Sequence, residues 1–244
     1  MNTIQAKYSR NFTEVFHSMG GFLIYFAILI IIPLWAQMKV KSAYKKYSQV
    51  PASSGMTGAQ VARKILDDNG LYNVTVEPIQ GKLTDHYDPR AKAVRLSEEN
   101  YYGHSVAGAA VAAHEVGHAM QDAEDYAFLR FRHALVPVAS FGSKSSFFII
   151  LAGIFMYNAN LILLGILFMA AAVLFQLVTL PVEFNASSRA MHQIVSVGVI
   201  RNNEERETKK VLDAAALTYV AAAVVAVMEL LRFVLMYIGM RSDD

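Results

Sequence analysis

Four long blocks of apolar residues, with very few charges in them, limit what this chain can fold into. A helix rises about 1.5 Å per residue, so about 20 apolar residues cross the hydrocarbon core of a bilayer. Hydrophobic residues make up 55% of the 244 residues, which is high for a domain that must stay in water. We therefore predict an integral membrane protein, mainly α-helical, with spans at residues 22–38, 136–157, 161–180 and 214–240.

The first block is either a span or a signal peptide. Lys7 and Arg10 precede it, but no small-residue cleavage site follows it. Lysines come directly after the block, as in a stop-transfer sequence, and they favour an uncleaved anchor. These lysines are Lys39, Lys41, Lys45 and Lys46.

The other blocks contain the few intramembrane charges. The second block holds Lys144 and is separated from the third by a short polar turn, residues 158–160, which predicts a tight helical hairpin. The fourth block holds Glu229 and Arg232, which are three residues apart and can pair on one helix face.

Basic residues predict how the spans are oriented, because loops rich in lysine and arginine face the cytoplasm. The lysines after the first span and the bases between the third and fourth spans both predict a cytoplasmic location. The turn at residues 158–160 and the acidic tail, Asp243 and Asp244, should then lie outside. The bases between the spans are Arg189, Arg201, Arg206, Lys209 and Lys210.

Cysteine usage and net charge exclude several kinds of site. The chain has no cysteine, so disulfides, thiolate metal sites and cysteine nucleophiles are excluded. Its net charge of +2 comes from bases beside the spans, so it indicates no nucleic-acid partner.

The segment between the first two spans is expected to be a small α+β insert. A helix should begin at Thr57 and end before Gly70. A strand should follow at 71–76. Residues 82–87 and 92–96 flank an Asp-Pro-Arg turn and should pair as a hairpin.

A helix rich in alanine and glycine is expected from Ser105, and it contains a His-Glu-x-x-His motif. His114 and His118 should lie one turn apart on one face, where both can bind one zinc ion. Glu115 is adjacent and can deprotonate a water molecule. A chance match and a pair of buried, hydrogen-bonded histidines are the alternatives, but the latter is costly on an apolar helix without partners.

A catalytic zinc ion needs a third protein ligand and an open position for water. Glu183 lies just beyond the third span, and the two intervening spans return the chain to the side of the motif. Topology therefore permits Glu183 to meet the histidines. The alternative is that Glu183 only marks the polar end of the span.

Three stretches together resemble the YugP-like neutral zinc metallopeptidases of bacterial membranes, and the resemblance covers nearly the whole chain. They are AAHEVGHAMQDAEDY, LTDHYDPRAKAVRLSEENYYGHS and PVEFNAS. The resemblance implies zinc ligands at His114, His118 and Glu183, a base at Glu115, and the same arrangement of spans. The α+β insert is then expected to be zincin-like, on the cytoplasmic side that the basic residues predict.

The chain is more distantly similar to the HtpX-type and prenyl-processing membrane proteases. Their third ligand lies in a Glu-x-x-x-Asp pattern, whose aspartate orients a zinc-bound histidine. Here Ser187 takes the place of that aspartate. A serine hydroxyl can accept the ring proton only more weakly and without charge.

The function expected from these features is peptide-bond hydrolysis by zinc-activated water, in a bacterial cell membrane, on peptide or protein substrates that include membrane-associated ones. By analogy with other zinc proteases, the AKAVRL strand would bind substrate if it lies at a sheet edge. The alternatives are a non-catalytic zinc-binding scaffold or regulator and a small transporter. The oxyanion donor stays open among Arg189, His192, His86 and Tyr101.

The expected organisation has five segments, and the sequence does not indicate an oligomeric state. The segments are an anchor segment (1–46), the insert (47–133), a transmembrane hairpin (134–182), a cytoplasmic segment with the third ligand (183–213) and a last span with the tail (214–244).

Overall fold

The computed structural model describes residues 18–242 of the chain. Lys7, Arg10, Asp243 and Asp244, which entered the prediction of topology, lie outside the described residues. The chain divides into two compact units. The helical unit consists of the described residues of Met1–Trp35, Phe131–Val178 and Val220–Asp244, and the α/β unit consists of Ala36–Arg130 and Thr179–Tyr219.

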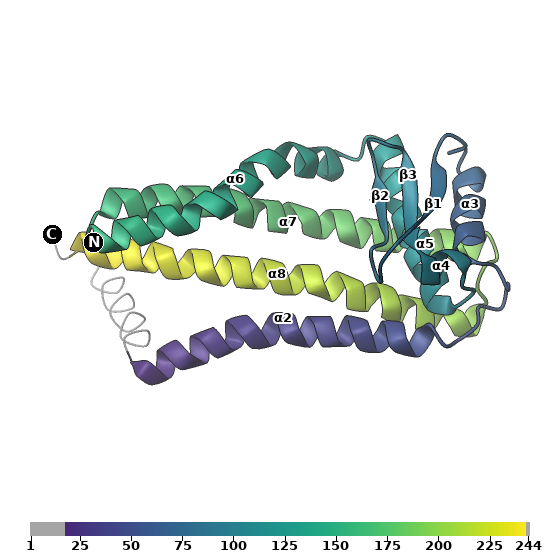
Figure 1. Cartoon of the computed structure of the whole chain (residues 1–244), viewed down its shortest axis with the longest axis horizontal. Coiled ribbons are helices and arrows are strands. Elements are labelled where there is room, and N and C mark those ends of the chain that lie inside the picture. Colours follow the sequence, from purple (N-terminus) through teal and green to yellow (C-terminus); the bar gives the residue numbers. More distant parts are fainter. Residues whose placement is uncertain (1–17, 243–244) are drawn as a thin grey trace. The chain divides into compact units, whose positions relative to one another are not determined.

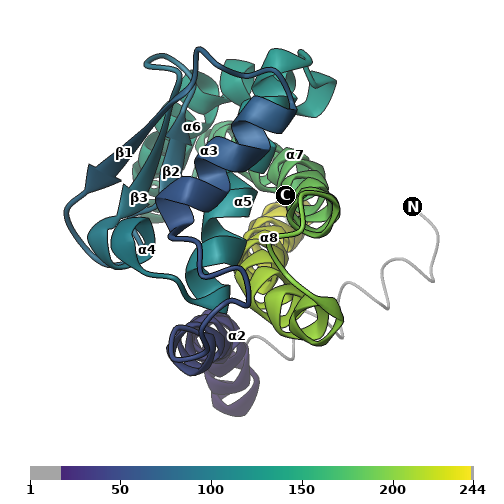
Figure 2. The same ribbon diagram turned by 90° about the vertical axis from the view of Figure 1, so that its right-hand side faces the viewer.

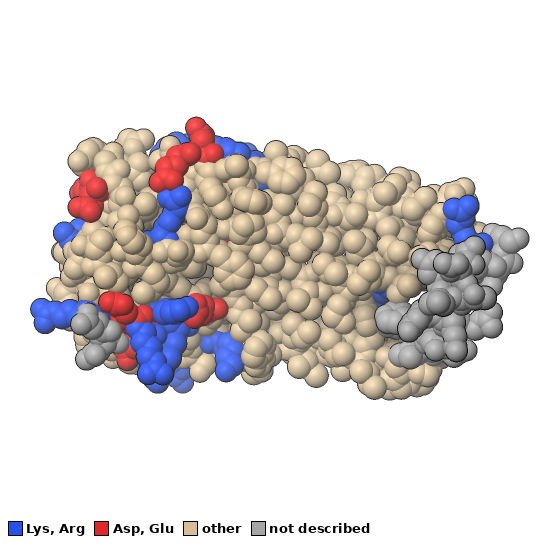
Figure 3. Space-filling model, turned by 180° about the vertical axis from the view of Figure 1, so that it is seen from behind, with Lys and Arg blue, Asp and Glu red and all other residues tan. Residues whose placement is uncertain are grey.

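Four helices among the described residues are long and apolar enough to cross a membrane, so the predicted number of spans and the mainly α fold are confirmed. Figure 3 shows that lysine, arginine, aspartate and glutamate gather over the α/β unit on that face, whereas the surface of the helical unit is largely uncharged. A lipid-facing surface needs this composition. The helices are α2 (Met19–Tyr47), α6 (Ala127–Phe155), α7 (Ala159–Ser196) and α8 (Asn202–Ser242).

The predicted hairpin of the second and third spans is formed by α6 and α7. The side chain of Asn158 accepts hydrogen bonds from the backbone of Asn160 and Leu161 at 3.0 and 3.2 Å and so caps α7. Further along the hairpin, a Cβ added at Gly142 would lie 2.5 Å from the carbonyl oxygen of Phe168. Small residues of this kind let two membrane helices pack closely.

The predicted pair of intramembrane charges on α8 is also confirmed. A guanidinium nitrogen of Arg232 lies 2.9 Å from a carboxylate oxygen of Glu229. The hydroxyl of Tyr25, on α2, donates a second hydrogen bond to Glu229 at 2.6 Å. The carboxylate is therefore neutralised and hydrogen-bonded within the helical unit.

In the α/β unit, α5 (Val106–Ala123) lies at the centre of the core. Figure 2 shows α3 (Gly58–Asp68) and the strands of the sheet next to α5. The predicted start of α3 at Thr57 is confirmed by a capping box, in which the threonine and Gln60 exchange side-chain-to-backbone hydrogen bonds. The side chains that cover α5 are fully buried and include Val61, Ile65, Val94, Leu96 and Ile194.

The sheet has three strands in the order β1 (Thr75–Ile79), β3 (Ala93–Ser97), β2 (His86–Asp88), and Figure 1 shows them beside α5. The predicted hairpin is confirmed, because β2 and β3 pair antiparallel. The condition under which the AKAVRL strand would bind substrate, a place at a sheet edge, is not met. That strand is β3, and it is central because β1 pairs with it in parallel on its other side.

The strand predicted at 71–76 begins later than expected, at Thr75. The guanidinium of Arg63 binds the carbonyl oxygens of Leu71 and Val74 at 3.0 and 2.6 Å. The backbone N–H of Leu71 donates to Leu66 at the end of α3. These bonds hold residues 71–74 in a turn, so the apolar residues there do not form a strand. The short helix α4 (Glu98–Tyr102) follows β3 and leads to α5.

Candidate metal centre

Helix α5 carries both histidines of the motif and begins where the sequence predicted. The side chain of Ser105 caps it by accepting a hydrogen bond from Gly108 N at 3.0 Å. Alanine and glycine make up half of the helix, so neighbouring elements can approach its backbone closely. The rings of His114 and His118 lie on one face with their centroids 4.8 Å apart.

Helix α7 meets α5 inside the motif itself, at Gly117. A Cβ added to Gly117 would lie 2.6 Å from the carbonyl oxygen of Ala186, which is closer than any real contact of this kind. Only glycine therefore lets the two backbones approach as they do. Because Ala186 is three residues from Glu183, this contact brings the glutamate to the histidines.

We expect Gly117→Ala to lower both thermal stability and zinc affinity. The added methyl group meets backbone, which has to move, and such overpacking costs about 1–3 kcal/mol. The matched control is Gly239→Ala, because nothing lies within 4 Å of a Cβ added there. Thermal unfolding and zinc retention in detergent test this. Wild-type values for Gly117→Ala would contradict the close packing of α5 on α7.

The structure brings His114, His118 and Glu183 together. The Nε2 atoms of the two histidines lie 3.3 and 3.5 Å from the same oxygen of Glu183. One candidate ligand atom from each residue lies within 4.8 Å of the others. Glu183 is 2% exposed, so its carboxylate is buried against the two rings.

These separations fit a metal ion better than a direct ion pair. Charge-assisted hydrogen bonds between nitrogen and carboxylate oxygen are usually about 2.7–2.9 Å long. Ligand atoms around a tetrahedral zinc ion, at bond lengths of about 2.0–2.2 Å, lie roughly 3.3–3.6 Å apart. Two imidazoles and one carboxylate are also a donor set of catalytic zinc, and they leave a fourth position for water.

Each histidine has a hydrogen-bond partner on its second ring nitrogen. The hydroxyl of Ser187 lies 3.2 Å from Nδ1 of His114. The side-chain oxygen of Gln121 lies 3.0 Å from Nδ1 of His118. Both Nε2 atoms therefore stay directed toward Glu183, as metal ligation requires.

Glu115 lies on α5 next to His114 and is 9% exposed. Burial alone would disfavour the charged form of His118. The hydrogen bond that protonated His118 donates to Glu183, together with the charges of Glu183 and Glu115, outweighs burial, so the pKa of His118 is raised above its ordinary value. The base predicted from the sequence is thus near enough to act on the centre electrostatically.

Zinc affinity should consequently fall as the medium becomes acidic. Only the neutral imidazole binds metal, and a raised pKa makes His118 take up its proton at a higher pH than free imidazole does. Equilibrium dialysis against a fixed free zinc concentration, from about pH 8 to about pH 5, measures this. Zinc retention that stays constant over that range would contradict ligation by His118.

A buried carboxylate fastens the edge of the sheet to the motif helix. Asp122, on α5, accepts hydrogen bonds from the hydroxyl of Tyr87 at 2.7 Å and the ammonium of Lys92 at 2.5 Å. Arg130 lies 3.0 Å from its other oxygen. Burial disfavours the charged form of Asp122, but the hydrogen bonds from Lys92 and Tyr87 outweigh it, so the pKa of Asp122 is lowered. Strand β2 is therefore the sheet edge that is held to α5.

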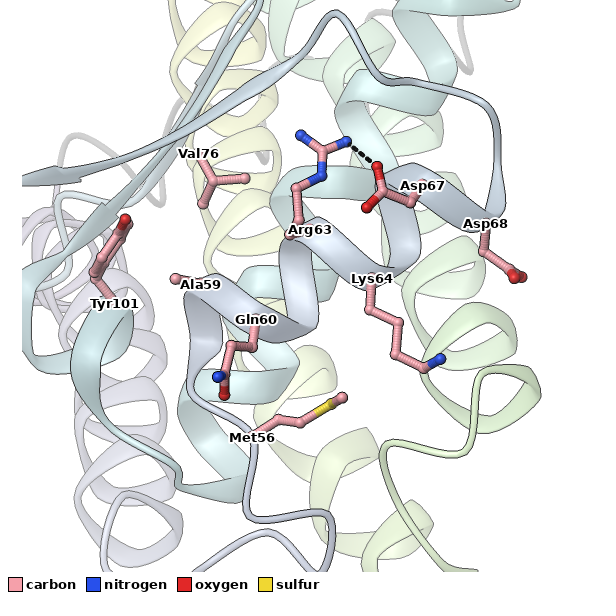
Figure 4. A pocket seen from close by; sticks show the side chains of 9 residues that line it. All are labelled: Met56, Ala59, Gln60, Arg63, Lys64, Asp67, Asp68, Val76 and Tyr101. Carbon is pink, nitrogen blue, oxygen red and sulfur yellow. Dashed lines mark ion pairs between the residues drawn. The ribbon is translucent and has the colours of Figure 1, made fainter.

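The four oxyanion donors that the sequence offered as candidates lie in four different environments. Arg189 forms two hydrogen bonds of 2.7 Å to Glu124. His192 is exposed, and Nδ1 of His86 lies 2.8 Å from a backbone carbonyl. Tyr101 lines a cavity of about 750 Å³ along α3, which contains none of the three candidate ligands (Figure 4).

Sequence reasoning missed two residues of the centre, Gln121 and Gly117. Gln121 follows His118 by three residues, so helix geometry places it on the same face, and this spacing was the available signal. Gly117 is a variable position of the motif pattern. Its importance depends on where α7 lies, which the spacing of the motif does not indicate.

The fold and the centre define a membrane protein with a His-Glu-x-x-His motif and a nearby buried glutamate. The family described as "Putative neutral zinc metallopeptidase" matches residues 22–238, and the chain belongs to this family, as the sequence resemblance predicted. It is 58% identical over 213 residues to the "Putative membrane protease YugP" of Bacillus subtilis (strain 168), which covers 87% of this chain and 95% of that protein. No solved structure matches the chain.

Proposed function

We propose that this protein is a membrane-embedded zinc endopeptidase. His114, His118 and Glu183 would hold the zinc ion, and Glu115 would be the general base. The observation that carries the proposal is the convergence of two imidazoles and a distant carboxylate at separations of 3.3 and 3.5 Å. The family and the 58% identical relative named as a membrane protease support the same activity.

The chemistry divides between the metal and the chain. Zinc bound at this centre would lower the pKa of a water molecule toward about 7 and polarise the scissile carbonyl. The carboxylate of Glu115 would accept the proton that the water loses as its oxygen attacks the carbonyl carbon. Glu115 would then donate that proton to the leaving amine nitrogen as the C–N bond breaks.

Substrate binding needs an exposed backbone edge beside the centre, and β2 replaces β3 as the candidate. It is a terminal strand of the sheet, and Tyr87 ties it to Asp122 on the motif helix. An extended peptide could add through backbone hydrogen bonds to its outer edge, which pairs with no strand of residues 18–242. Such binding depends little on side chains, so it suits hydrolysis of unfolded or extended segments.

Two other functions have less support. A non-catalytic zinc scaffold would use the three ligands but has no use for Glu115. A transporter was suggested by the charges on α8, but Glu229 is paired with Arg232 and hydrogen-bonded by Tyr25. Those charges are accounted for by contacts within the helical unit.

Inhibition by a chelator tests the proposed activity. We expect purified protein in detergent to cleave a denatured protein substrate, to lose this activity with 1,10-phenanthroline and to recover it with added zinc. The matched control is 1,7-phenanthroline, which has similar size and polarity but does not chelate. Cleavage that survives complete metal removal would rule out a zinc peptidase.

We also propose that the α/β unit faces the cytoplasm. It contains the lysines that follow the first span and the basic segment between the last two spans, and both obey the positive-inside rule. The chain has no cysteine, so single cysteines report topology directly. We expect Asn160→Cys to react with an impermeant maleimide in intact cells, and Asp68→Cys to react only after permeabilisation. The reverse pattern would place the site outside.

A further inference from the structure

Gln121 is a fully buried amide at the centre, and its exposed fraction is 0%. Its nitrogen donates to the carbonyl oxygen of Val182 at 2.8 Å and to the side-chain oxygen of Asn185 at 2.9 Å. Its oxygen lies 3.0 Å from Nδ1 of His118. Both ends of the amide are therefore occupied, one by a candidate zinc ligand and the other by the helix that carries Glu183.

These contacts fix which way the amide faces. The carbonyl oxygen of Val182 can only accept a hydrogen bond, so the nitrogen of Gln121 must point toward it. The oxygen of Gln121 then faces His118, whose Nδ1 must carry the hydrogen atom. In the neutral ring this leaves the lone pair on Nε2, the atom 3.5 Å from Glu183.

The same side chain fixes the position of α7. Val182 directly precedes Glu183, and Asn185 follows it by two residues. Gln121 therefore forms hydrogen bonds to α7 on both sides of the third ligand. Asn185 is held in turn by Arg189, whose Nε donates to the same side-chain oxygen at 2.7 Å. A shift of α7 that displaced Glu183 would therefore break the hydrogen bonds of Gln121.

We propose that Gln121 is the positioning residue of the zinc site, which orients His118 for ligation through Nε2 and holds α7 at the distance that ligation by Glu183 needs. This inference rests on the proposed function of the same centre. Ser187, on α7, also links the two helices, but through a single hydrogen bond to His114, whereas Gln121 joins His118 to two groups on α7. Loss of a hydrogen-bond partner of a metal-binding histidine typically weakens metal affinity about 10- to 100-fold.

The test compares zinc dissociation constants of purified variants, measured by competition with a chromophoric chelator. We expect Gln121→Met, which keeps the volume but none of the hydrogen bonds, to bind zinc about 10- to 100-fold more weakly. Gln121→Glu keeps an acceptor for His118 but loses the donor to Val182 and Asn185, so it should recover only the part of the loss that comes from the orientation of His118. Asn185→Ala leaves the side-chain oxygen of Gln121 in place as the acceptor for His118, and it should weaken zinc binding less than Gln121→Met does.

The matched control is Gln193→Met. Gln193 also links α7 to the end of α3, through hydrogen bonds of 3.1 and 3.2 Å with Asn69, and neither of these bonds involves a histidine. Its zinc affinity should stay within about threefold of wild type, well below the loss expected for Gln121→Met. Thermal unfolding of the zinc-free proteins shows whether loss of stability is shared by the two variants.

The outcomes separate this inference from the proposed function. Wild-type protein that binds no zinc contradicts the proposed function. If the wild type binds zinc and Gln121→Met binds it equally well, only the positioning role is overturned. Equal weakening in Gln121→Met and Gln193→Met would show general loosening of α7, and it too would overturn the role. Should Gln121→Met fail to fold, Gln121→Glu still decides, because wild-type zinc affinity in this variant, whose carboxylate cannot donate to Val182 and Asn185, would contradict the role of Gln121 in holding α7.

Discussion

Replacing Glu183 by alanine should leave a folded protein that no longer retains zinc and no longer cleaves peptides. Glu183 is 2% exposed and lies against both candidate histidine ligands, so its removal leaves two ligands and an open cavity. The whole binding energy of a protein zinc site is about 10–16 kcal/mol. If one of three ligands carries about a third of it, affinity should fall on the order of 10²- to 10⁴-fold.

Zinc per chain after dialysis against a dilute chelator measures this effect. The matched control is Glu98→Ala, because Glu98 is an exposed glutamate at the start of α4. Glu183→Gln keeps the shape of the side chain but lacks its charge, and should fall between alanine and wild type. Full zinc content in Glu183→Ala would show that the third ligand is a different residue.

Replacing Glu115 by glutamine should lower turnover by orders of magnitude while leaving zinc content unchanged. The amide is nearly isosteric with the carboxylate but cannot accept the proton of the attacking water. Loss of a general base typically lowers kcat/KM about 10²- to 10⁴-fold. Steady-state cleavage and zinc content, measured on the same preparation, test this together.

This variant separates an enzyme from a zinc-binding scaffold. In a scaffold, Glu115→Gln would change neither zinc content nor any biological readout. Glu98→Gln controls for the loss of one carboxylate from an exposed position. Cleavage by Glu115→Gln at the wild-type rate would exclude Glu115 as the base, whatever metal the protein holds.

The spans were predictable because their apolar blocks are longer than a helix buried in the core of so small a soluble insert would need to be. The ends of the helices were less predictable. Helix α7 continues through Pro181 to Ser196, since nothing after the apolar block breaks it and its buried residues pack in the α/β unit. Hydropathy indicates where the apolar block ends, but α7 itself ends later, at Ser196.

The sheet shows the limit of local pattern. Antiparallel pairing of β2 with β3 followed from the short turn between them, so the sequence was enough to predict it. The parallel pairing of β1 with β3 joins segments separated by β2, and no local signal encodes it. The sequence therefore left open whether the AKAVRL strand has a neighbour on both sides, and β1 is that second neighbour.

At the centre, helix periodicity predicted that the two histidines share a face, and counting membrane crossings showed only that topology permits Glu183 to approach them. The residues that hold them did not follow from either. The role of Gln121 depends on the conformation of its side chain, and the role of Gly117 depends on how closely α5 and α7 approach. The spacing of residues in the sequence indicates neither. Ser187 lies beside His114, where the comparison with more distant proteases placed it.

The measurement that tests the central proposal most directly is a zinc titration of the metal-free protein, with peptide cleavage as the readout. We expect no cleavage without metal and a linear rise that ends sharply at about one zinc ion per chain, because one set of three ligands is present among the described residues. Cleavage by the metal-free protein, or stoichiometric zinc binding that never produces cleavage, would contradict the account.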